Sequence, residues 1–167
     1  MRKELLTWDD IDQLLDTLRP QFRGEFEAML MITRGGIIPG GLVAEALNIK
    51  YTLTAAVHFP GGDLPIPKLA ALPEFLQFPD DHLLAGRRTL VIDDVWGSGR
   101  TITAVKDRVE AAGGRPVTCV FHFNPYRSLF TKAEPTYYGA TTDAHIVYPW
   151  EIDRGMDAIM AREPMLG

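Results

Sequence analysis

Residues 89–101, Thr-Leu-Val-Ile-Asp-Asp-Val-Trp-Gly-Ser-Gly-Arg-Thr, form the most informative pattern in this chain of 167 residues. The segment begins with apolar and β-branched residues, which predict a strand buried on both faces. Two adjacent carboxylates, Asp93 and Asp94, are expected to close that strand. A loop of small residues at 97–99 follows, and apolar residues at helical spacing then predict a helix over Thr101 to Ala112.

The loop of small residues is suited to binding a phosphate group. A loop that leads into a helix leaves several backbone N–H groups without partners, and the helix dipole adds positive potential at the same place. The two carboxylates beside it would repel an anion unless a Mg²⁺ ion or a sugar diol lay between them. The pattern therefore predicts a ligand that carries a phosphate, a diol and a bound metal ion.

Three other kinds of segment fit this pattern less well. A dinucleotide-binding loop needs a third glycine at the position of Ile102. A Walker A loop needs Gly-Lys followed by Ser or Thr, which is absent here. A phosphorylation receiver domain also has paired acids after an apolar strand, but near its start, and too little of this chain follows residue 101 to complete that fold.

The segment from Val91 to Thr101 resembles the signature of type I phosphoribosyltransferases, which bind 5-phosphoribosyl-1-pyrophosphate. The resemblance implies that Asp93 and Asp94 are catalytic, hold the ribose hydroxyls and serve as ligands of Mg²⁺, the expected cofactor. It also implies that the following loop and the start of the helix bind the phosphate. The residues concerned are Gly97, Ser98, Gly99, Arg100 and Thr101.

A second strand, glycine-rich turn and helix occur earlier, over residues 28–47. Arg34 stands at the carboxyl end of the predicted strand, and the glycines after it let a ligand approach the backbone. Such turns are also common without ligands. The order of strand, Arg-Gly-Gly, apolar pair and Pro-Gly resembles the pyrophosphate loop of the xanthine–guanine branch of the family, with Thr33 in place of a serine. The resemblance implies that Arg34 and Gly35 bind the pyrophosphate and that Arg34 is catalytic.

The alternation of strands and helices predicts an α/β fold in which helices flank a parallel twisted sheet with right-handed crossovers. Both glycine-rich loops then emerge at the carboxyl ends of the strands, where ligands bind in such sheets. The resemblance implies a single domain over residues 1–167, with a flexible loop near 60–81 and a small C-terminal hood near 137–155. The other expected elements are a helix over Ile11–Leu18 capped by Thr7, a helix over Ile38–Leu47, strands at Ala28–Ile32, Tyr51–Phe59 and Val117–Phe123, and a short helix within Leu69–Leu76.

The residues expected to bind the base come from the last third of the chain. The apolar run that leads into Pro-Trp-Glu at 149–151 resembles the hood of the xanthine–guanine branch. The resemblance implies that His145 stacks on the base and that Ile146 offers main-chain groups to it, although an ordinary half-buried imidazole explains His145 equally well. Asn124 replaces a lysine that recognises the exocyclic oxygen, and its neutral amide distinguishes oxygen from amino substituents less decisively. Gly97 replaces the acid that faces N7 in 6-oxopurine enzymes.

Composition narrows the expected partners. A formal net charge of -5 argues against general nucleic-acid binding by charge, and no apolar run approaches the roughly 20 residues that span a bilayer. Cys119 is the only cysteine, so an intramolecular disulfide is impossible, and no secretory signal is visible. We therefore expect a cytoplasmic protein, a homo-oligomer (dimer or tetramer), that binds phosphoribosyl pyrophosphate and a nucleobase but neither nucleic acid nor membrane.

The expected activity is transfer of the phosphoribosyl group to a nucleobase in purine salvage, with release of pyrophosphate. Hypoxanthine, guanine and xanthine are expected ahead of adenine. Two alternatives remain open: a regulator that keeps the phosphoribosyl-pyrophosphate site as a sensor without transfer, and a transferase for a pyrimidine or another ring. Pyrophosphate release with a panel of bases separates the three.

Overall fold

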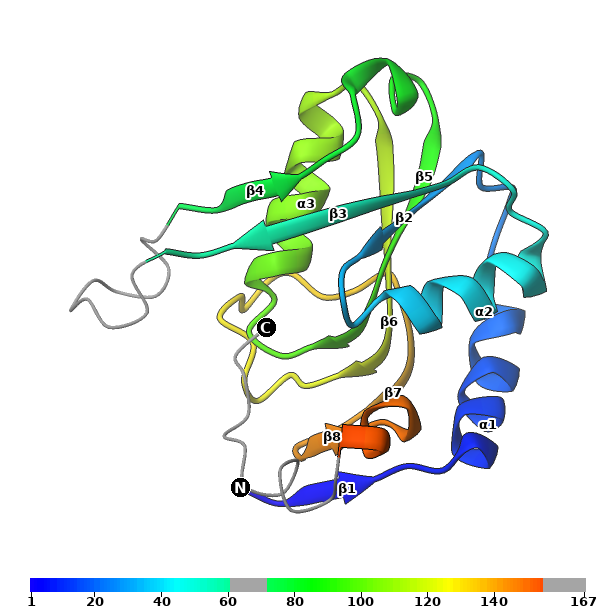
Figure 1. The fold of residues 1–167 in the computed structure, drawn as a ribbon, viewed down its shortest axis with the longest axis vertical. Coiled ribbons are helices and arrows are strands. Elements are labelled where there is room, and N and C mark those ends of the chain that lie inside the picture. The colour runs from blue at the N-terminus through cyan, green and yellow to red at the C-terminus, as the bar shows by residue number, and fades with distance from the viewer. Residues whose placement is uncertain (61–71, 155–167) are drawn as a thin grey trace.

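The structure is a computed structural model, and it describes residues 1–60 and 72–154. Its centre is a six-stranded sheet in the order β4-β3-β2-β5-β6-β7, and a two-stranded sheet pairs β1 with β8 (Figure 1). All neighbours in the large sheet pair in parallel except β3 and β4. Its strands are β2 (Ala28–Ile32), β3 (Thr52–His58), β4 (Glu74–Gln77), β5 (Arg88–Trp96), β6 (Arg115–Phe123) and β7 (Tyr137–Thr141).

Helices cover both faces of the large sheet, which confirms the expected fold class. The helices are α1 (Trp8–Leu18), α2 (Ile37–Leu47) and α3 (Arg100–Ala111), with 3₁₀ turns at Arg19–Gln21, Asp81–Leu83 and Pro149–Arg154. Side chains of α1 and α2 pack with one buried cluster, and those of α3 pack with a second cluster on the other face. Within residues 1–60 and 72–154, no helix has the length and apolar character needed to cross a membrane.

The helix boundaries follow from local capping chemistry. The backbone N–H of Asp10 donates to the Thr7 hydroxyl, and the Thr7 N–H donates to the Asp10 carboxylate at 2.7 Å, so the two residues form a capping box that begins α1. Asn48 ends α2 in the left-handed conformation with φ 53°. Gly113, with φ 84°, follows the end of α3. These boundaries confirm the three long helices expected from the sequence to within one or a few residues.

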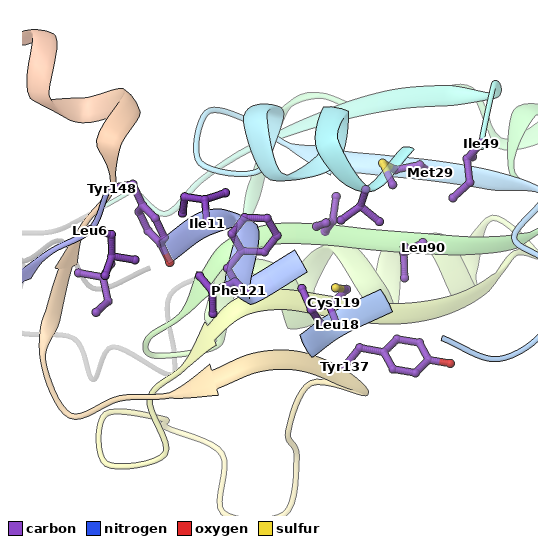
Figure 2. Packing of buried hydrophobic residues seen from close by; sticks show 14 of the residues in the cluster. Leu6, Ile11, Leu18, Met29, Ile49, Leu90, Cys119, Phe121, Tyr137 and Tyr148 are labelled. Carbon is purple, nitrogen blue, oxygen red and sulfur yellow. The ribbon is translucent and has the colours of Figure 1, made fainter. Parts of the chain in front are cut away.

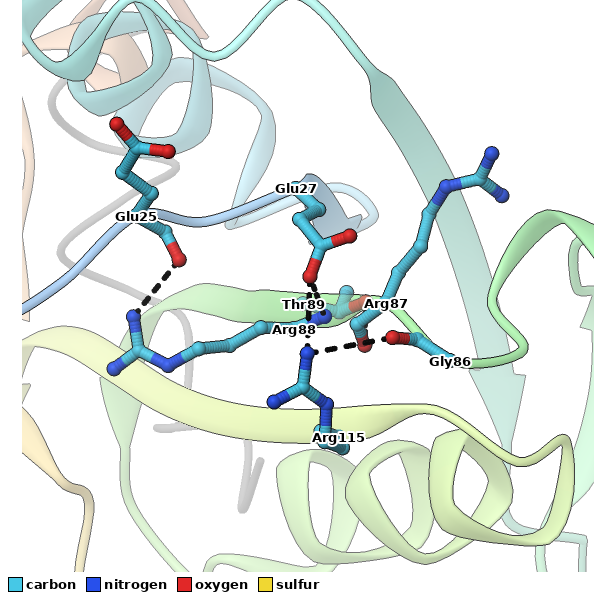
Figure 3. A network of polar contacts seen from close by, with 7 residues as sticks. All are labelled: Glu25, Glu27, Gly86, Arg87, Arg88, Thr89 and Arg115. Carbon is cyan, nitrogen blue, oxygen red and sulfur yellow. Dashed lines mark hydrogen bonds and ion pairs between the residues drawn. The ribbon is translucent and has the colours of Figure 1, made fainter.

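Polar contacts tie the strands together at their amino ends (Figure 3). Arg115 pairs with the Glu27 carboxylate at 3.0 Å, and Arg88 donates to the main-chain oxygen of Glu25 at 3.1 Å. The pair between Arg115 and Glu27 is solvent-exposed, so its contribution to stability is small, about 0–1 kcal/mol. These contacts nevertheless occupy the amino ends of β2, β5 and β6 and leave the opposite, carboxyl ends for the loops that the sequence singles out.

The segment expected to be an irregular loop contains an ordered strand. Glu74–Gln77 pairs antiparallel with β3, so the short helix expected within Leu69–Leu76 is wrong for the residues described there. The physical reason is the half-buried Phe75, whose ring contacts Phe78 at 5.3 Å between centroids, while its neighbours face solvent. Residues 61–71 of the expected flexible loop lie outside the described part of the chain.

The small two-stranded sheet and the turn after it, called the hood below, combine the first strand of the chain with residues from its last third. β1 (Lys3–Leu5) pairs in parallel with β8 (His145–Val147), and the Pro149–Arg154 turn follows. Tyr137–Thr141, expected within the hood near 137–155, instead forms β7 at the edge of the large sheet because it pairs with β6. Residue 155 lies outside the described residues.

One buried cluster joins the hood to the large sheet (Figure 2). Tyr148 and Leu6 lie at its hood end, and Phe121 from β6 and Leu90 from β5 continue it under the sheet. Tyr148 is 1% exposed, which is unusual for a side chain that ends in a hydroxyl. The hood is therefore fixed on the sheet by apolar packing.

Candidate active site

The two acids lie on β5 beside the carboxyl ends of its neighbours. The strand continues through Trp96, so Asp93 and Asp94 do not end it as expected. Backbone groups orient both side chains: Asp93 Oδ1 accepts from the Asp94 N–H at 2.9 Å, and Asp94 Oδ1 accepts from the Val95 N–H at 2.7 Å. Both residues remain partly exposed, so a ligand can reach them.

The acid pair carries more negative charge than its surroundings stabilise. Burial, followed by repulsion from Asp94, raises the pKa of Asp93 well above its usual range. Burial also raises the pKa of Asp94 to about 6, against the backbone hydrogen bond from Val95 and the side-chain contact with Asp93, which lower it. A cation, or the hydroxyl donors of a sugar, would favour the ionised form of both carboxylates. The pair is therefore suited to such a ligand.

The loop after β2 packs directly against the acid pair. A Cβ atom on Gly35 would lie 2.6 Å from Asp94 Oδ1, and one on Gly36 would overlap the main-chain oxygen of Ile92. A side chain on Gly36 would have to move the backbone of β5, and one on Gly35 would have to displace the Asp94 carboxylate. Arg34 is exposed at the same edge, and its peptide bond with Thr33 is cis. The structure thus brings together Arg34, Gly35 and Asp94, which the sequence places about 60 residues apart.

The loop after β5 begins α3 and presents an uncompensated positive helix end. Gly99 has φ 81°, and a Cβ there would overlap the Trp96 indole, so only glycine suits this turn. The first turn of α3 contains no acid, whereas that of α1 contains Asp9 and Asp10. Arg100 adds a second positive charge at this end, and its guanidinium lies 4.1 Å from the Phe59 ring centre. An anion bound here would balance both charges.

The serine of this loop is already part of its internal structure. Ser98 is 1% exposed, and its hydroxyl accepts a hydrogen bond from the Arg100 N–H at 3.3 Å. Its main-chain oxygen accepts from the Leu129 N–H at 3.0 Å. Thr101 follows in the first turn of α3. Gly97, Ser98 and Gly99 are therefore held as a compact turn that leads from β5 into the start of α3.

In the two-stranded sheet of the hood, the main-chain groups of Ile146 point away from the neighbouring strand β1. The His145 N–H donates to the Arg2 oxygen, and the Val147 oxygen accepts from the Leu6 N–H, both at 2.9 Å. Backbone groups of successive strand residues point to opposite sides, so the N–H and C=O of Ile146 point away from β1. No other described strand pairs with β8. This geometry is compatible with the expected use of Ile146. Burial lowers the pKa of His145, which favours the neutral form of its ring.

Asn124 has a structural role that the sequence did not reveal. It follows β6, is 2% exposed, and its Oδ1 accepts from the N–H groups of Tyr126 and Arg127, each at 3.2 Å. Because N–H groups can only donate, these contacts fix which end of the amide is the oxygen. The side chain can therefore offer a ligand the Nδ2 donor but not the acceptor.

Tyr148 connects the hood to β5, and sequence reasoning missed it. Its hydroxyl donates to the main-chain oxygen of Asp94 at 3.0 Å, and it lies 2.9 Å from His122 Nδ1. Its backbone N–H donates to the Glu151 carboxylate at 2.8 Å, and its ring stacks on Trp150 at 4.5 Å. The Pro-Trp-Glu motif located the hood, but no local signal shows that Tyr148 reaches back to β5.

A metal ion at this site would have to share its ligands with the substrate. No group of three or more His, Cys, Asp or Glu side chains that could hold a metal occurs in the described part of the chain. Two adjacent carboxylates whose pKa values are raised nevertheless fit Mg²⁺, which prefers oxygen ligands and usually binds through one or two carboxylates together with phosphates and water. Asp93 and Asp94 are thus compatible with Mg²⁺ brought in by a phosphate ligand.

The chain matches a known protein family over most of its length. Residues 2–151 match the model of the phosphoribosyl transferase domain. The chain belongs to the phosphoribosyltransferase family. It is therefore an enzyme of the pentosyltransferase class, as the resemblance of the segment from Val91 to Thr101 implied.

Individual relatives cover nearly the whole phosphoribosyltransferase chain. The xanthine-guanine phosphoribosyltransferase of Ruegeria sp. is 29% identical over 158 residues, which span 88% of this chain and 84% of the relative. The crystal structure of a purine phosphoribosyltransferase from Pyrococcus horikoshii matches with a TM-score of 0.73 and 26% identity, over 90% of this chain and 95% of that one. The Helicobacter pylori xanthine-guanine-hypoxanthine enzyme matches with a TM-score of 0.69 at 16% identity, over 96% of this chain and all (100%) of that one, which supports the fold alone.

Proposed function

We propose that this phosphoribosyltransferase transfers the 5-phosphoribosyl group from phosphoribosyl pyrophosphate to a 6-oxopurine and releases pyrophosphate. The observation that carries the proposal is the packing of Gly35 against the Asp94 carboxylate, because it joins the loop after β2 and the acid pair of β5 in one site. The names of the relatives from Ruegeria and Pyrococcus support a purine as the acceptor. Hypoxanthine, guanine and xanthine are the preferred bases, ahead of adenine.

Opposite charges grow on the two parts of the substrate during the reaction, and different site residues stabilise each of them. Positive charge develops on the ribose, and the carboxylates of Asp93 and Asp94, which hold its hydroxyls, stabilise that charge. Negative charge develops on the leaving pyrophosphate, which Arg34 and the backbone of Gly35 bind. Preorganised charge of this kind is often the largest contribution to catalysis. Mg²⁺ held by the two carboxylates would neutralise part of the pyrophosphate charge.

The 5-phosphate binds at the start of α3, where the helix end and Arg100 supply positive potential. The residues assigned to it are Gly97, Ser98, Gly99, Arg100 and Thr101. The base lies under the hood, where Ile146 offers main-chain groups to its edge and the neutral ring of His145 stacks on its face. Asn124 offers its Nδ2 donor to the exocyclic oxygen. A donor at that place favours an oxo over an amino substituent.

The cellular setting follows from the same proposal. A transferase that uses free purine bases acts in purine salvage, and we place it in the cytoplasm, where phosphoribosyl pyrophosphate is made and consumed. The net charge of -5 argues against nucleic acid as a partner. The proposed enzyme acts as a homo-oligomer, a dimer or tetramer, for which exposed apolar side chains such as Trp8 at 53% and Ile37 at 44% are candidate contacts.

The test is pyrophosphate release from Mg²⁺ and phosphoribosyl pyrophosphate with a panel of purines and pyrimidines. We expect turnover with hypoxanthine, guanine and xanthine, and less with adenine. Turnover of uracil or orotate alone would show that the acceptor is a pyrimidine and not a purine. Binding of phosphoribosyl pyrophosphate without turnover of any base would favour a sensor that has lost transfer activity.

Asn124→Asp tests the assignment of the base edge. The carboxylate can still accept from the N–H groups of Tyr126 and Arg127, so the turn is kept, but the Nδ2 donor is lost. We expect the KM for hypoxanthine to rise at least about fivefold, since one mismatched polar contact costs about 1–3 kcal/mol. The KM for phosphoribosyl pyrophosphate should stay constant. An unchanged KM for hypoxanthine would remove Asn124 from the base site.

A further inference from the structure

Tyr148 is held at all of its polar and aromatic groups. Its backbone N–H is bound by the Glu151 carboxylate, its ring stacks on Trp150 with an interplanar angle of 5°, and its hydroxyl contacts both Asp94 and His122. Figure 2 shows the side chain at the hood end of the buried cluster, beside Leu6 and Ile11. A residue fixed in so many ways has one position relative to the sheet.

The direction of the hydrogen bonds at the Tyr148 hydroxyl follows from its partners. The main-chain oxygen of Asp94 can only accept, so the hydroxyl donates to it at 3.0 Å. The hydroxyl oxygen is then free to accept from His122 Nδ1 at 2.9 Å, which requires the proton on that nitrogen. Burial lowers the pKa of His122 to about 4, so the ring is neutral near pH 7. The hydrogen bonds therefore all run in one direction, from His122 through the Tyr148 hydroxyl to the main-chain oxygen of Asp94.

This chain of hydrogen bonds joins the two halves of the site. Asp94 belongs to the half proposed to hold the ribose. Tyr148 is only two residues from Ile146, whose main chain faces away from β1 and is proposed to bind the base. The distance between Asp94 and the Ile146 backbone is thus set through one rigid side chain. In a reaction between two bound substrates, small errors in their relative position cost rate even where each substrate still binds.

We propose that Tyr148 is a positioning residue that holds the base-binding hood in register with the acid pair, so that the base nitrogen is aligned with C1 of the ribose. The inference rests on the proposed function, because it assigns the base to the hood and the ribose to Asp93 and Asp94. Tyr148 itself touches neither substrate. Its hydroxyl acts through the main chain of Asp94, and His122 acts through that hydroxyl.

Tyr137 provides a matched control, because its buried hydroxyl has only a structural role. It is also buried, 8% exposed, and belongs to the same apolar cluster as Tyr148. Its hydroxyl accepts one hydrogen bond, from the Arg23 N–H at 3.3 Å, and Tyr137 lies on β7 rather than in the hood. Tyr137→Phe and Tyr148→Phe therefore each remove a buried hydroxyl and keep the ring, but only the second breaks a contact with the acid pair.

The experiment compares both variants with the wild-type protein in turnover and in binding. Kinetics give kcat and KM for hypoxanthine and phosphoribosyl pyrophosphate. Calorimetry gives the affinities for inosine 5′-monophosphate, which occupies both halves of the site, and for ribose 5-phosphate, which occupies one. For Tyr148→Phe we expect kcat and the inosine monophosphate affinity to fall about tenfold, while both KM values and the ribose 5-phosphate affinity change less than threefold. Tyr137→Phe should leave all of these unchanged.

A second variant keeps the inference testable if Tyr148→Phe folds poorly. His122→Phe removes the donor to the Tyr148 hydroxyl but leaves the hydroxyl bound to Asp94, so the same pattern is expected at about threefold. The inference is overturned if kcat and inosine monophosphate affinity are unchanged in these variants, or if Tyr137→Phe loses as much. A wild-type protein that neither turns over a purine nor binds inosine monophosphate would overturn the proposed function and this inference with it.

Discussion

Replacing both Asp93 and Asp94 by Asn should weaken Mg²⁺-dependent binding of phosphoribosyl pyrophosphate about a hundredfold, or ~2.7 kcal/mol. The substitution keeps the size of both side chains but removes two charges. Hydrogen bonds to charged groups are worth about 1.5–3 kcal/mol each, and the ribose hydroxyls and the metal both depend on these charges in the proposed site. Calorimetry with and without Mg²⁺ measures the loss directly.

The double variant should fold normally, which makes the binding result interpretable. The Oδ1 atom of Asn at position 93 can still accept from the N–H of residue 94, and that of Asn at position 94 can still accept from the Val95 N–H, as the carboxylates do in the structure. Burial disfavours the charges of both acids, so neutral side chains should not lower the melting temperature. Asp12→Asn combined with Asp16→Asn on the exposed side of α1 makes the same change in net charge and should leave binding unaltered. Full affinity in the Asp93 and Asp94 variant would refute the assignment of the acid pair.

The parts of the fold that the sequence predicted correctly are those specified by local signals. The buried runs of β2 and β5, the capping box of α1 and the glycine after α3 each depend on residues within a few positions of one another. Parallel strands then bring their carboxyl ends together, so Gly35 and Asp94 could be expected to meet. The family resemblance supplied the chemistry that the pattern alone leaves open.

The features that were missed depend on contacts between distant residues or on very short elements. β1 has three residues, two of them charged, and it becomes a strand only because His145–Val147 lies beside it. β4 has one half-buried side chain, Phe75, which is too little for a periodic signal. The reach of Tyr148 to Asp94 spans 54 residues. In contrast, the turn capped by Asn124 could have been recognised, because Asn-Pro is a common start for such turns.

Gly97→Asp should raise kcat with hypoxanthine about tenfold to a hundredfold. In the 6-oxopurine enzymes that this chain resembles, an acid at this position faces N7 of the purine, and general acid–base assistance is typically worth ~10²–10⁴ in rate. The backbone conformation at residue 97 is not one that glycine alone adopts. Positive φ angles occur at Gly24, Gly86, Gly99 and Gly113 in the described part of the chain, and Gly97 is not among them.

Two further variants distinguish an effect of the added acid on the reaction from an effect of a distorted loop. Gly97→Asn introduces a side chain of the same size without the acid, so it should not raise kcat. Gly99→Asp places a side chain at φ 81° and against the Trp96 indole, so it should abolish phosphate binding by disrupting the turn. If Gly97→Asp and Gly97→Asn give the same kcat while both still bind phosphoribosyl pyrophosphate, N7 does not face residue 97. The purine would then lie in another orientation under the hood, and its proton would have to leave to water, to pyrophosphate or to a hood residue.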